Sequence, residues 1–440
     1  MTSTLTLITI VFFMLSSLTT LASDNISRED LIAWIASGDA LPPPQAGKTL
    51  GAGDDAIMAF LPPGYANEYN FPGVRLEIQT TTQFEPHQTY VEASAVHNGT
   101  ARLAADGALL NYVAGRPFDP SLFEKVTPEE AGFMLAWNHV HRWQYYGWLN
   151  EELTMYYIQP ASNGRNQLRP GFSGGGHIDR YISLSYQRVY LSHLAMLSET
   201  EYKIDLKDGG GYFFKDHMLF HEPFDVKGTE FVIERATDPH ELDQINSYLP
   251  TERRVRRLSA KERADRFMGS DMTMDDFEGF SGQILHYKWR YLGSRRLLAV
   301  VDSKAPTIVF FGPESRVAND EWQLRPTYAV EIVSTWHDHP YSSRILFIDA
   351  ETYNVTTSLA FNREGQMWRM NSLFYWLPEP GEGGLTAIET SLQRLAGTTM
   401  IDRLSGTSTV SRMIKPTQMP SLSVAEIKRR FSVSALTGGR

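Results

Sequence analysis

Residues 248–280, YLPTERRVRRLSAKERADRFMGSDMTMDDFEGF, carry the densest charge in the sequence, in two blocks of opposite sign. The basic block comprises Arg253, Arg254, Arg256, Arg257, Lys261, Arg263 and Arg266, and the acidic block that follows comprises Asp271, Asp275, Asp276 and Glu278. In an extended strand, Arg253, Val255 and Arg257 share one face, and the intervening residues share the other. Neither face is apolar, so the pattern does not predict an ordinary half-buried core strand.

Two helix starts follow the arginines. Ser259 and Glu262 match the capping box Ser-x-x-Glu. They predict a short helix that ends near Gly269, a residue type that commonly stops helices. Thr273 and Asp276 indicate a second, weaker cap.

The charges of this stretch have two interpretations. Salt bridges between the arginines and the downstream aspartates would fix a loop across a sheet. Alternatively, an arginine row at the mouth of a cavity would meet an anionic head group or the acidic surface of a partner. The predicted polar or partner site comprises Arg253, Arg254, Arg256, Arg257, Asp271 and Asp276. Nucleic acid is not an expected partner, because the chain is acidic and shows no second basic patch.

Composition indicates a large, acidic globular protein. The chain has 440 residues, 42% of them hydrophobic, and a formal net charge of −10. This is enough apolar material for a sizeable core. The predicted organisation is a signal peptide (1–22), N-terminal helices and first strands (23–150), a main antiparallel half-barrel (151–380), and a C-terminal helix with a tail (381–440). No linker separates residues 23–150 from 151–380, so we expect them to form one domain.

The first residues and the cysteine count predict the compartment. Residues 1–22 contain an uncharged apolar run and small residues at Thr20 and Ala22, as a cleavable secretory signal peptide does. The missing Lys or Arg at its start leaves an uncleaved membrane anchor as the alternative. The sequence contains no cysteine, which excludes a disulfide scaffold and a lipid anchor. We therefore expect a protein of the Gram-negative periplasm that is not lipid-anchored.

Alternating strands dominate the rest of the chain and predict a mainly β (α+β) fold. We expect a large curved antiparallel sheet, an incompletely closed half-barrel with helices in its concavity. Aromatic residues recur at alternate strand positions, as in YKWRY at 287–291. They could form an ordinary core, or line a cavity for a hydrophobic ligand. The predicted ligand-binding set is Tyr287, Trp289, Tyr291, Trp336, Trp368, Phe374 and Trp376.

Catalytic patterns are weak. Gly171–Gly175 matches G-x-S-x-G, but a polar loop precedes it, where a nucleophile elbow needs a buried strand. His337 and His339 would share a strand face and are a weak metal candidate, but Pro340 follows at once. We therefore expect a protein that is not an enzyme and that has no cofactor.

Three blocks resemble a known family, the domain-of-unknown-function family numbered 1329. The first runs from Tyr248 to Asp276 and contains Arg253–Arg257 and Gly269-Ser270-Asp271. The second is Asn111–Phe118, similar to the family's YVAGxPFP with Asp119 in the last place, and the third runs from Tyr328 to Asp349. The resemblance implies a fold similar to the lipoprotein carriers LolA and LolB, in which helices sit in the mouth of a curved sheet. It also implies association with transporters of the resistance-nodulation-division type.

The combined expectation is a periplasmic carrier for a lipid or other hydrophobic compound that serves an envelope transport system. Its partner would be a resistance-nodulation-division-type transporter or an outer-membrane protein. A hydrolase or metal-assisted enzyme using His337, Asp338 and His339 is the first alternative. A non-catalytic scaffold subunit of an envelope complex is the second.

Overall fold

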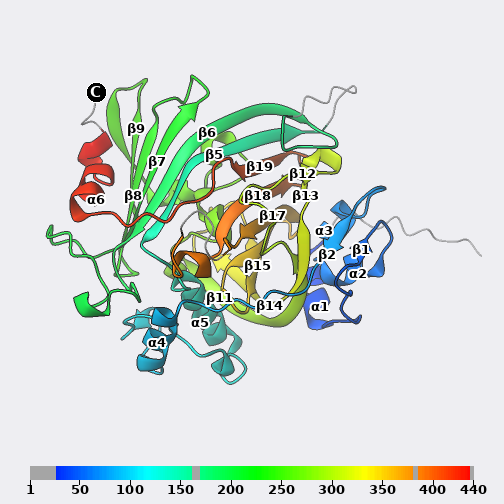
Figure 1. The fold of residues 1–440 in the computed structure, drawn as a ribbon, viewed down its shortest axis with the longest axis horizontal. Helices are drawn as coiled ribbons and strands as arrows, with labels where there is room; N and C mark the ends of the chain where they lie inside the picture. The colour runs from blue at the N-terminus through cyan, green and yellow to red at the C-terminus, as the bar shows by residue number, and fades with distance from the viewer. Residues whose placement is uncertain (1–25, 161–168, 380–384, 437–440) are drawn as a thin grey trace, which may run out of the picture.

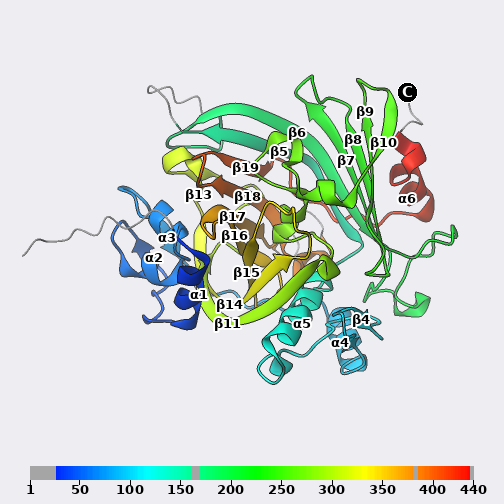
Figure 2. The ribbon, with the colours of Figure 1, turned by 180° about the vertical axis from the view of Figure 1, so that it is seen from behind.

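A single curved sheet organises the computed structural model, which describes residues 26–160, 169–379 and 385–436 (Figures 1 and 2). The predicted signal peptide, residues 1–22, lies outside the described residues. The sheet has 15 strands in the order β1-β2-β14-β15-β16-β17-β18-β19-β5-β6-β7-β8-β9-β10, with β11 paired to β14. Its ends do not pair with each other, so the predicted open, mainly β fold is confirmed. Among the described residues, no helix combines the length and the apolar character needed to cross a membrane.

The strands of the large sheet are β1 (Thr49–Leu50), β2 (Leu76–Ile78), β5 (Gly147–Gln159), β6 (His177–Tyr190), β7 (Tyr212–Glu222), β8 (Glu230–Ala236), β9 (Gln244–Leu249), β10 (Arg254–Leu258), β11 (Tyr287–Ala299), β14 (Glu321–Ser334), β15 (Ser343–Asp349), β16 (Val355–Phe361), β17 (Met367–Trp376), β18 (Arg394–Asp402) and β19 (Ser408–Met413). Two small sheets pair β3 (Arg102–Leu103) with β4 (Leu109–Leu110), and β12 (Phe310–Phe311) with β13 (Val317–Ala318). The α-helices are α1 (Arg28–Ala36), α2 (Asp55–Phe60), α3 (Tyr65–Glu68), α4 (Gln88–Val96), α5 (Pro128–Val140) and α6 (Val424–Arg430).

Pairing in the large sheet is antiparallel except between β2 and β14, which run parallel with Glu77 opposite Glu321. Two antiparallel meanders, β14–β19 and β5–β10, make up most of it. They join where β19 pairs with β5, with Val410 opposite Tyr156. Residues far apart in the sequence therefore meet in the middle of the sheet, and the fold is one continuous layer.

The prediction of a C-terminal helix and tail over 381–440 is wrong for much of that range. Residues 394–402 and 408–413 form β18 and β19, between β17 and β5. β18 contains the β-branched residues Thr398, Thr399 and Ile401, which favour strands. The residues before them, Leu392 to Ala396, have high helix propensity, but pairing on both sides of the strand overrides that local preference. The helix expected near the start of this range is replaced by a 3₁₀ turn (Glu389–Ser391) and β18, and α6 lies in the part expected to be the tail.

Both faces of the sheet are covered. Helices α1–α3 pack with β11 and β14–β18 on one face, in a core that includes Ile57, Phe60 and Phe347. Helix α5 covers the other, concave face, where Leu135 and Ala136 pack with residues of β11 and β14–β17. Residues 260–280 cover the concave face of β5–β9, β18 and β19, and we call them the plug segment.

Local residues fix where helix α5 begins and how closely it packs against the sheet. Thr127 caps it and forms a capping box with Glu130, and Pro128 occupies the first turn. Gly132 lets the helix approach β11 closely, because a Cβ there would lie 2.6 Å from the Arg290 backbone nitrogen. The helix ends at the mouth of the concave face, where the candidate site begins.

Candidate functional site

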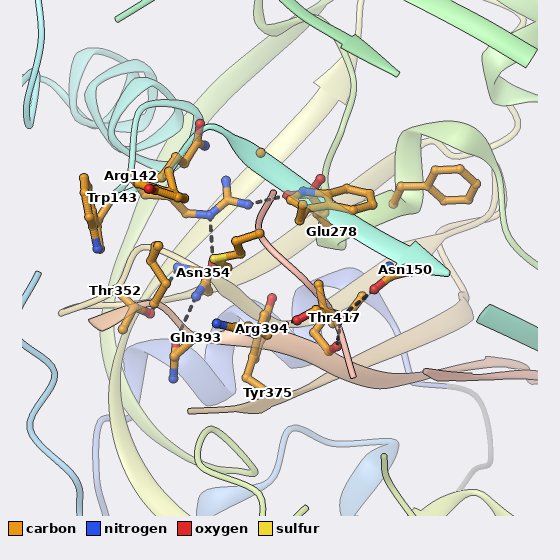
Figure 3. Close-up of a pocket in the computed structure, with 18 of the residues that line it drawn as sticks. Arg142, Trp143, Asn150, Glu278, Thr352, Asn354, Tyr375, Gln393, Arg394 and Thr417 are labelled. Atoms are coloured by element: carbon orange, nitrogen blue, oxygen red, sulfur yellow. Dashed lines mark hydrogen bonds and ion pairs between the residues drawn. The ribbon is translucent and has the colours of Figure 1, made fainter. Parts of the chain in front are cut away.

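A cavity of about 420 Å³ lies on the concave face, between the sheet, the end of α5 and the plug segment (Figure 3). Its apolar lining includes Trp148, Leu153, Met155, Leu184, Met218, Phe267, Met272, Phe277, Leu395, Met413 and Met419. Methionine is frequent in this lining, and its unbranched thioether side chain adapts to ligands of different shape. A largely apolar cavity with a few polar groups is the usual form of a small-molecule site.

A chain of hydrogen bonds forms one polar wall of this cavity. The Arg142 Nε donates to Asn354 Oδ1 at 2.7 Å, and Arg142 Nη2 pairs with Glu278. Asn354 Nδ2 in turn donates to Gln393 Oε1 at 2.7 Å (Figure 3). These residues come from the end of α5, the plug segment and two loops, so the wall forms only in the folded protein.

A second polar group lies on the sheet side. Thr398 on β18 lines the cavity and is 4% exposed, and within the part of the chain that the structure describes its hydroxyl has no hydrogen-bond partner. Nearby in the lining, the Thr417 hydroxyl donates to Asn150 Oδ1. A buried hydroxyl without a partner is costly, and a ligand with a polar group could satisfy the one on Thr398.

Buried charges hold the plug segment against the cavity wall. Glu278 Oε1 pairs with Arg188 Nη1 of β6 at 2.7 Å, and Arg188 also pairs with Asp216 of β7. Burial by itself raises the pKa of Glu278, but the guanidinium groups of Arg188 and Arg142 lower it below its usual range. Glu278 therefore stays ionised, and the charges on this wall offset one another.

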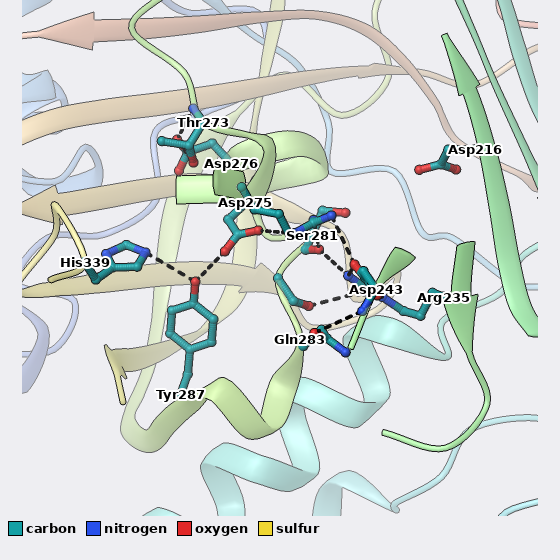
Figure 4. Close-up of polar contacts among 12 residues, drawn as sticks. Asp216, Arg235, Asp243, Thr273, Asp275, Asp276, Ser281, Gln283, Tyr287 and His339 are labelled. Atoms are coloured by element: carbon teal, nitrogen blue, oxygen red, sulfur yellow. Dashed lines mark hydrogen bonds and ion pairs between the residues drawn. The ribbon is translucent and has the colours of Figure 1, made fainter. Parts of the chain in front are cut away.

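Two other charged residues of the plug segment, Arg263 and Asp275, belong to a buried polar network (Figure 4). Asp275 Oδ1 accepts from Arg263 Nε at 2.7 Å, and Tyr287 Oη donates to Asp275 Oδ2 at 2.6 Å. Arg263 also pairs with Asp243, which Arg235 binds through both carboxylate oxygens. Although burial opposes ionisation of Asp275, the Arg263 charge and these hydrogen bonds lower its pKa to about 2. Both predicted capping boxes, at Ser259 and at Thr273, are present, although the helices that they start are short 3₁₀ turns.

The predicted polar or partner site divides into two separate places. Arg253, Arg254, Arg256 and Arg257 are exposed on or beside β10, the last strand of the sheet. Arg254 pairs with Glu252 and Arg256 with Glu262, both neighbours in the chain.

The aspartates of that predicted site are buried instead. Asp276 pairs with Arg344 of β15, and Asp271 accepts a hydrogen bond from Thr407. Burial and the Asp402 carboxylate raise the pKa of Asp271. Salt bridges between the basic block and the downstream aspartates do exist, but the arginines that form them are Arg263 and Arg266.

The predicted aromatic set lies elsewhere than in the lining of this cavity. Tyr287, Trp289 and Tyr291 are buried on β11 against α5. Phe374 and Trp376 face the opposite side of the sheet, with the N-terminal helices.

The other two aromatics lie at strand ends. Trp336 rests against His286 with ring centroids 4.8 Å apart, and Trp368 Nε1 donates to Asp402. Tyr375, between Phe374 and Trp376 in the sequence, is the β17 residue in the cavity lining.

The histidines of the weak metal candidate point apart. The His337 side chain is 91% exposed, whereas His339 is buried 3.4 Å from the Tyr287 hydroxyl. Over the described ranges, no group of three or more His, Cys, Asp or Glu side chains is placed to hold a metal ion.

Sequence reasoning missed most residues of the cavity. Arg142, Asn354 and Gln393 belong to segments with no recognisable motif, and they meet only through the fold. The methionines of the strands are the feature of the sequence that could have indicated the cavity. Met155, Met218 and Met413 occupy strand positions where an ordinary core favours branched residues.

Comparisons with known proteins bear on the whole chain. The sequence profile of a family described as "Protein of unknown function (DUF1329)" matches residues 59–437. A DUF1329 family protein from Desulfovibrio piger is 16% identical, with a TM-score of 0.45 over 71% of this chain and 100% of its own. A domain described as outer membrane lipoprotein-sorting, from Vibrio parahaemolyticus, is 16% identical, with a TM-score of 0.44 over 70% of this chain and 99% of its own. A LolA superfamily protein from Nitrosomonas europaea is 11% identical, with a TM-score of 0.34 over 69% of this chain and 97% of its own. A search of the curated proteins finds no match.

Proposed function

We propose that this chain, which belongs to the DUF1329 family, is a periplasmic carrier that holds a lipid or other hydrophobic compound in the 420 Å³ cavity. The observation that carries the proposal is the cavity itself, with its methionine-rich lining on the concave face of the sheet. Each methylene group that a ligand buries there contributes about 0.8 kcal/mol before the cost of ordering it. Export through the predicted signal peptide supports the assignment to the envelope.

The polar groups of the cavity narrow the chemistry of this ligand. Glu278 already offsets the charge of Arg142, so the polar wall does not call for a counter-ion. Thr398 offers a hydroxyl on the opposite side. We therefore expect an amphipathic ligand, with an apolar body against the methionines and a hydrogen-bonding group near Thr398 or Asn354.

The exposed arginines beside β10 are a candidate docking site for an envelope partner, such as a resistance-nodulation-division-type transporter or an outer-membrane protein. Arg253, Arg254, Arg256 and Arg257 give one sheet edge a positive charge in a protein whose net charge is −10. Such an edge fits an acidic surface. Reversing Arg254 and Arg256 to Glu should abolish co-purification of a transport partner from membranes, while the ligand content of the protein stays unchanged.

Mass spectrometry of the bound ligand tests the carrier function directly. The protein would be purified from its native periplasm without detergent, and an organic extract would be analysed. A single co-purifying hydrophobic compound supports a carrier and identifies its cargo. A protein that extracts empty and binds no lipid offered in excess contradicts it and favours the scaffold alternative.

A cavity-filling variant assigns the ligand to this cavity. Leu184→Trp adds volume inside the lining and should lower the amount of co-purified ligand at least about tenfold. Leu404→Trp is the matched control, because Leu404 is 59% exposed and lies outside the lining. Equal ligand content in both variants would place the ligand elsewhere.

A further inference from the structure

A second cavity, of about 260 Å³, lies on the other side of the end of α5. His141 lines this cavity, whereas the next residue, Arg142, lines the large one. Its remaining lining includes Tyr112 from the Asn111–Phe118 motif, Trp137 of α5, His193 and Phe213. The carrier function proposed above makes no use of it.

His141 is the central group of this second cavity. It is 8% exposed; its backbone carbonyl accepts from Tyr90 Oη at 2.8 Å, and over the described ranges neither ring nitrogen makes a hydrogen bond. Aromatic rings surround it: the Tyr112 ring centroid lies 4.2 Å away, and the Trp137 ring is stacked at 5.9 Å. The imidazole is thus held rigidly, and its hydrogen-bonding capacity is left for a ligand.

His193 adds a hydrogen-bond acceptor on the neighbouring wall. Its Nδ1 lies 2.8 Å from the carbonyl oxygen of Val113, to which only an N–H can donate, so in the neutral ring Nε2 carries the lone pair. The rings of His141 and His193 are 5.1 Å apart. Burial lowers the pKa of both histidines, which favours the neutral form of each ring.

The charged groups around this cavity are already engaged. The Arg235 guanidinium donates to both carboxylate oxygens of Asp243 and to the backbone carbonyls of Ser281 and Gly282. Asp238, at the exposed rim, pairs with His240. The cavity therefore offers aromatic walls and neutral nitrogen groups, which do not fit an ionic ligand.

We propose that this cavity is a second binding site, for a small uncharged aromatic compound that carries a hydroxyl or N–H donor. The ring of the compound packs between Tyr112, Trp137 and Phe213, and its donor binds the imidazole of His141 or Nε2 of His193. The geometry is that of a phenol or a small N–H heteroaromatic.

Phenol and anisole are matched probes for this site, since anisole has the same ring but its methyl ether cannot donate. We expect calorimetric titration of the full chain to show saturable binding of phenol, with anisole at least about tenfold weaker, the effect of one lost hydrogen bond. Equal affinity for the two compounds, or no binding of phenol, would overturn the proposal.

Four variants locate the binding. His141→Phe keeps an aromatic ring at this position but removes the imidazole nitrogens, and should abolish the preference for phenol over anisole. His193→Phe changes a less buried position and is the second variant if His141→Phe fails to fold. His337→Phe is the control, because His337 is exposed and outside the lining of both cavities, and it should bind like the wild type. Leu184→Trp, which fills the large cavity, should leave phenol binding unchanged. Phenol preference that survives both His141→Phe and His193→Phe, or that is lost in Leu184→Trp, would contradict the second site.

Discussion

Glu278 of the plug segment and Arg188 of β6 form an ion pair across the concave face, with Oε1 and Nη1 2.7 Å apart. Both side chains are largely buried, and Arg142 at the end of α5 binds the second oxygen of the same carboxylate. One carboxylate thus connects the sheet, the plug segment and the helix. Because Arg142 and Glu278 also line the large cavity, the contacts that fix the fold are the contacts that shape the site.

Glu278→Gln should destabilise the protein. The substitution leaves two buried guanidinium groups short of a countercharge, and breaking a buried pair in this way costs about 3–5 kcal/mol. Urea unfolding followed by circular dichroism measures this loss.

Glu252→Gln is the matched control for that experiment. It removes the partner of exposed Arg254, so its cost should stay below about 1 kcal/mol. Equal free energies of unfolding for the two variants would show that Glu278 does not hold the plug segment.

His139 should make the protein less stable in mild acid. Burial lowers its pKa to about 4, compared with about 6.5 in the unfolded chain. Between these values the unfolded state binds a proton that the folded state does not, so the stability present above pH 6.5 is lost as the pH falls towards 4. The loss from this residue is about 3 kcal/mol. Urea unfolding at pH 7 and at pH 4.5 measures it.

Proton NMR of the histidine rings tests the cause of that loss. The His139 resonance should not titrate above pH 5, whereas exposed His240 should titrate above its usual range, since the hydrogen bonds that its ring donates to the carboxylates of Asp106 and Asp238 raise its pKa. A His139 titration near 6.5 would refute the explanation.

Thr398→Val should separate stability from ligand binding. The variant keeps the shape of the side chain and removes a buried hydroxyl that has no partner in the described chain, so the free energy of unfolding should stay the same or rise by about 1 kcal/mol. Affinity for the co-purified ligand should fall, because its hydrogen bond to the protein is lost.

Thr399→Val is the control for the Thr398 experiment. Thr399 is the next residue of β18 and faces the other side of the sheet, so its substitution should not change ligand affinity. If both variants bind the ligand as the wild type does, Thr398 is not a ligand contact.

The two groups of arginines in the basic block should behave differently. Arg263→Ala removes the buried ion-pair partner of Asp275 and one of the two guanidinium partners of Asp243, and should cost about 3–5 kcal/mol. Arg254→Ala removes an exposed side chain and should change stability by less than about 0.5 kcal/mol. Thermal unfolding of the two variants compares them, and a large effect of Arg254→Ala would assign β10 a structural role.

Local features of the sequence were predicted well where a short-range pattern decides them. Alternation on β10 is an example: Val255 packs with Val232 and Leu436 on one face, and Leu258 packs with the plug segment's cluster on the other. The capping boxes at Ser259 and Thr273 also follow directly from residue types and spacing.

β17 shows where such reasoning fails. A strand exposes alternate residues on opposite faces, so a shift of one position exchanges the two sets. Phe374 and Trp376 were predicted to face a ligand, but they pack against the N-terminal helices, and Tyr375 faces the cavity. Both faces of this strand are apolar and covered, so the sequence carries no sign of which one is concave.

The sequence by itself determined the mainly β fold class, the family and the places where short helices start, because these depend on residue type at fixed spacing. Only the tertiary structure decided that β18 and β19 form strands, that Glu278 lies between Arg142 and Arg188, and that Thr398 lines the cavity. These features depend on neighbours that are distant in the sequence: Glu278 and Arg188 are 90 residues apart, and β19 pairs with β5 from the first half of the chain. Such pairs come together through the packing of the whole chain, because no local preference of the sequence specifies them.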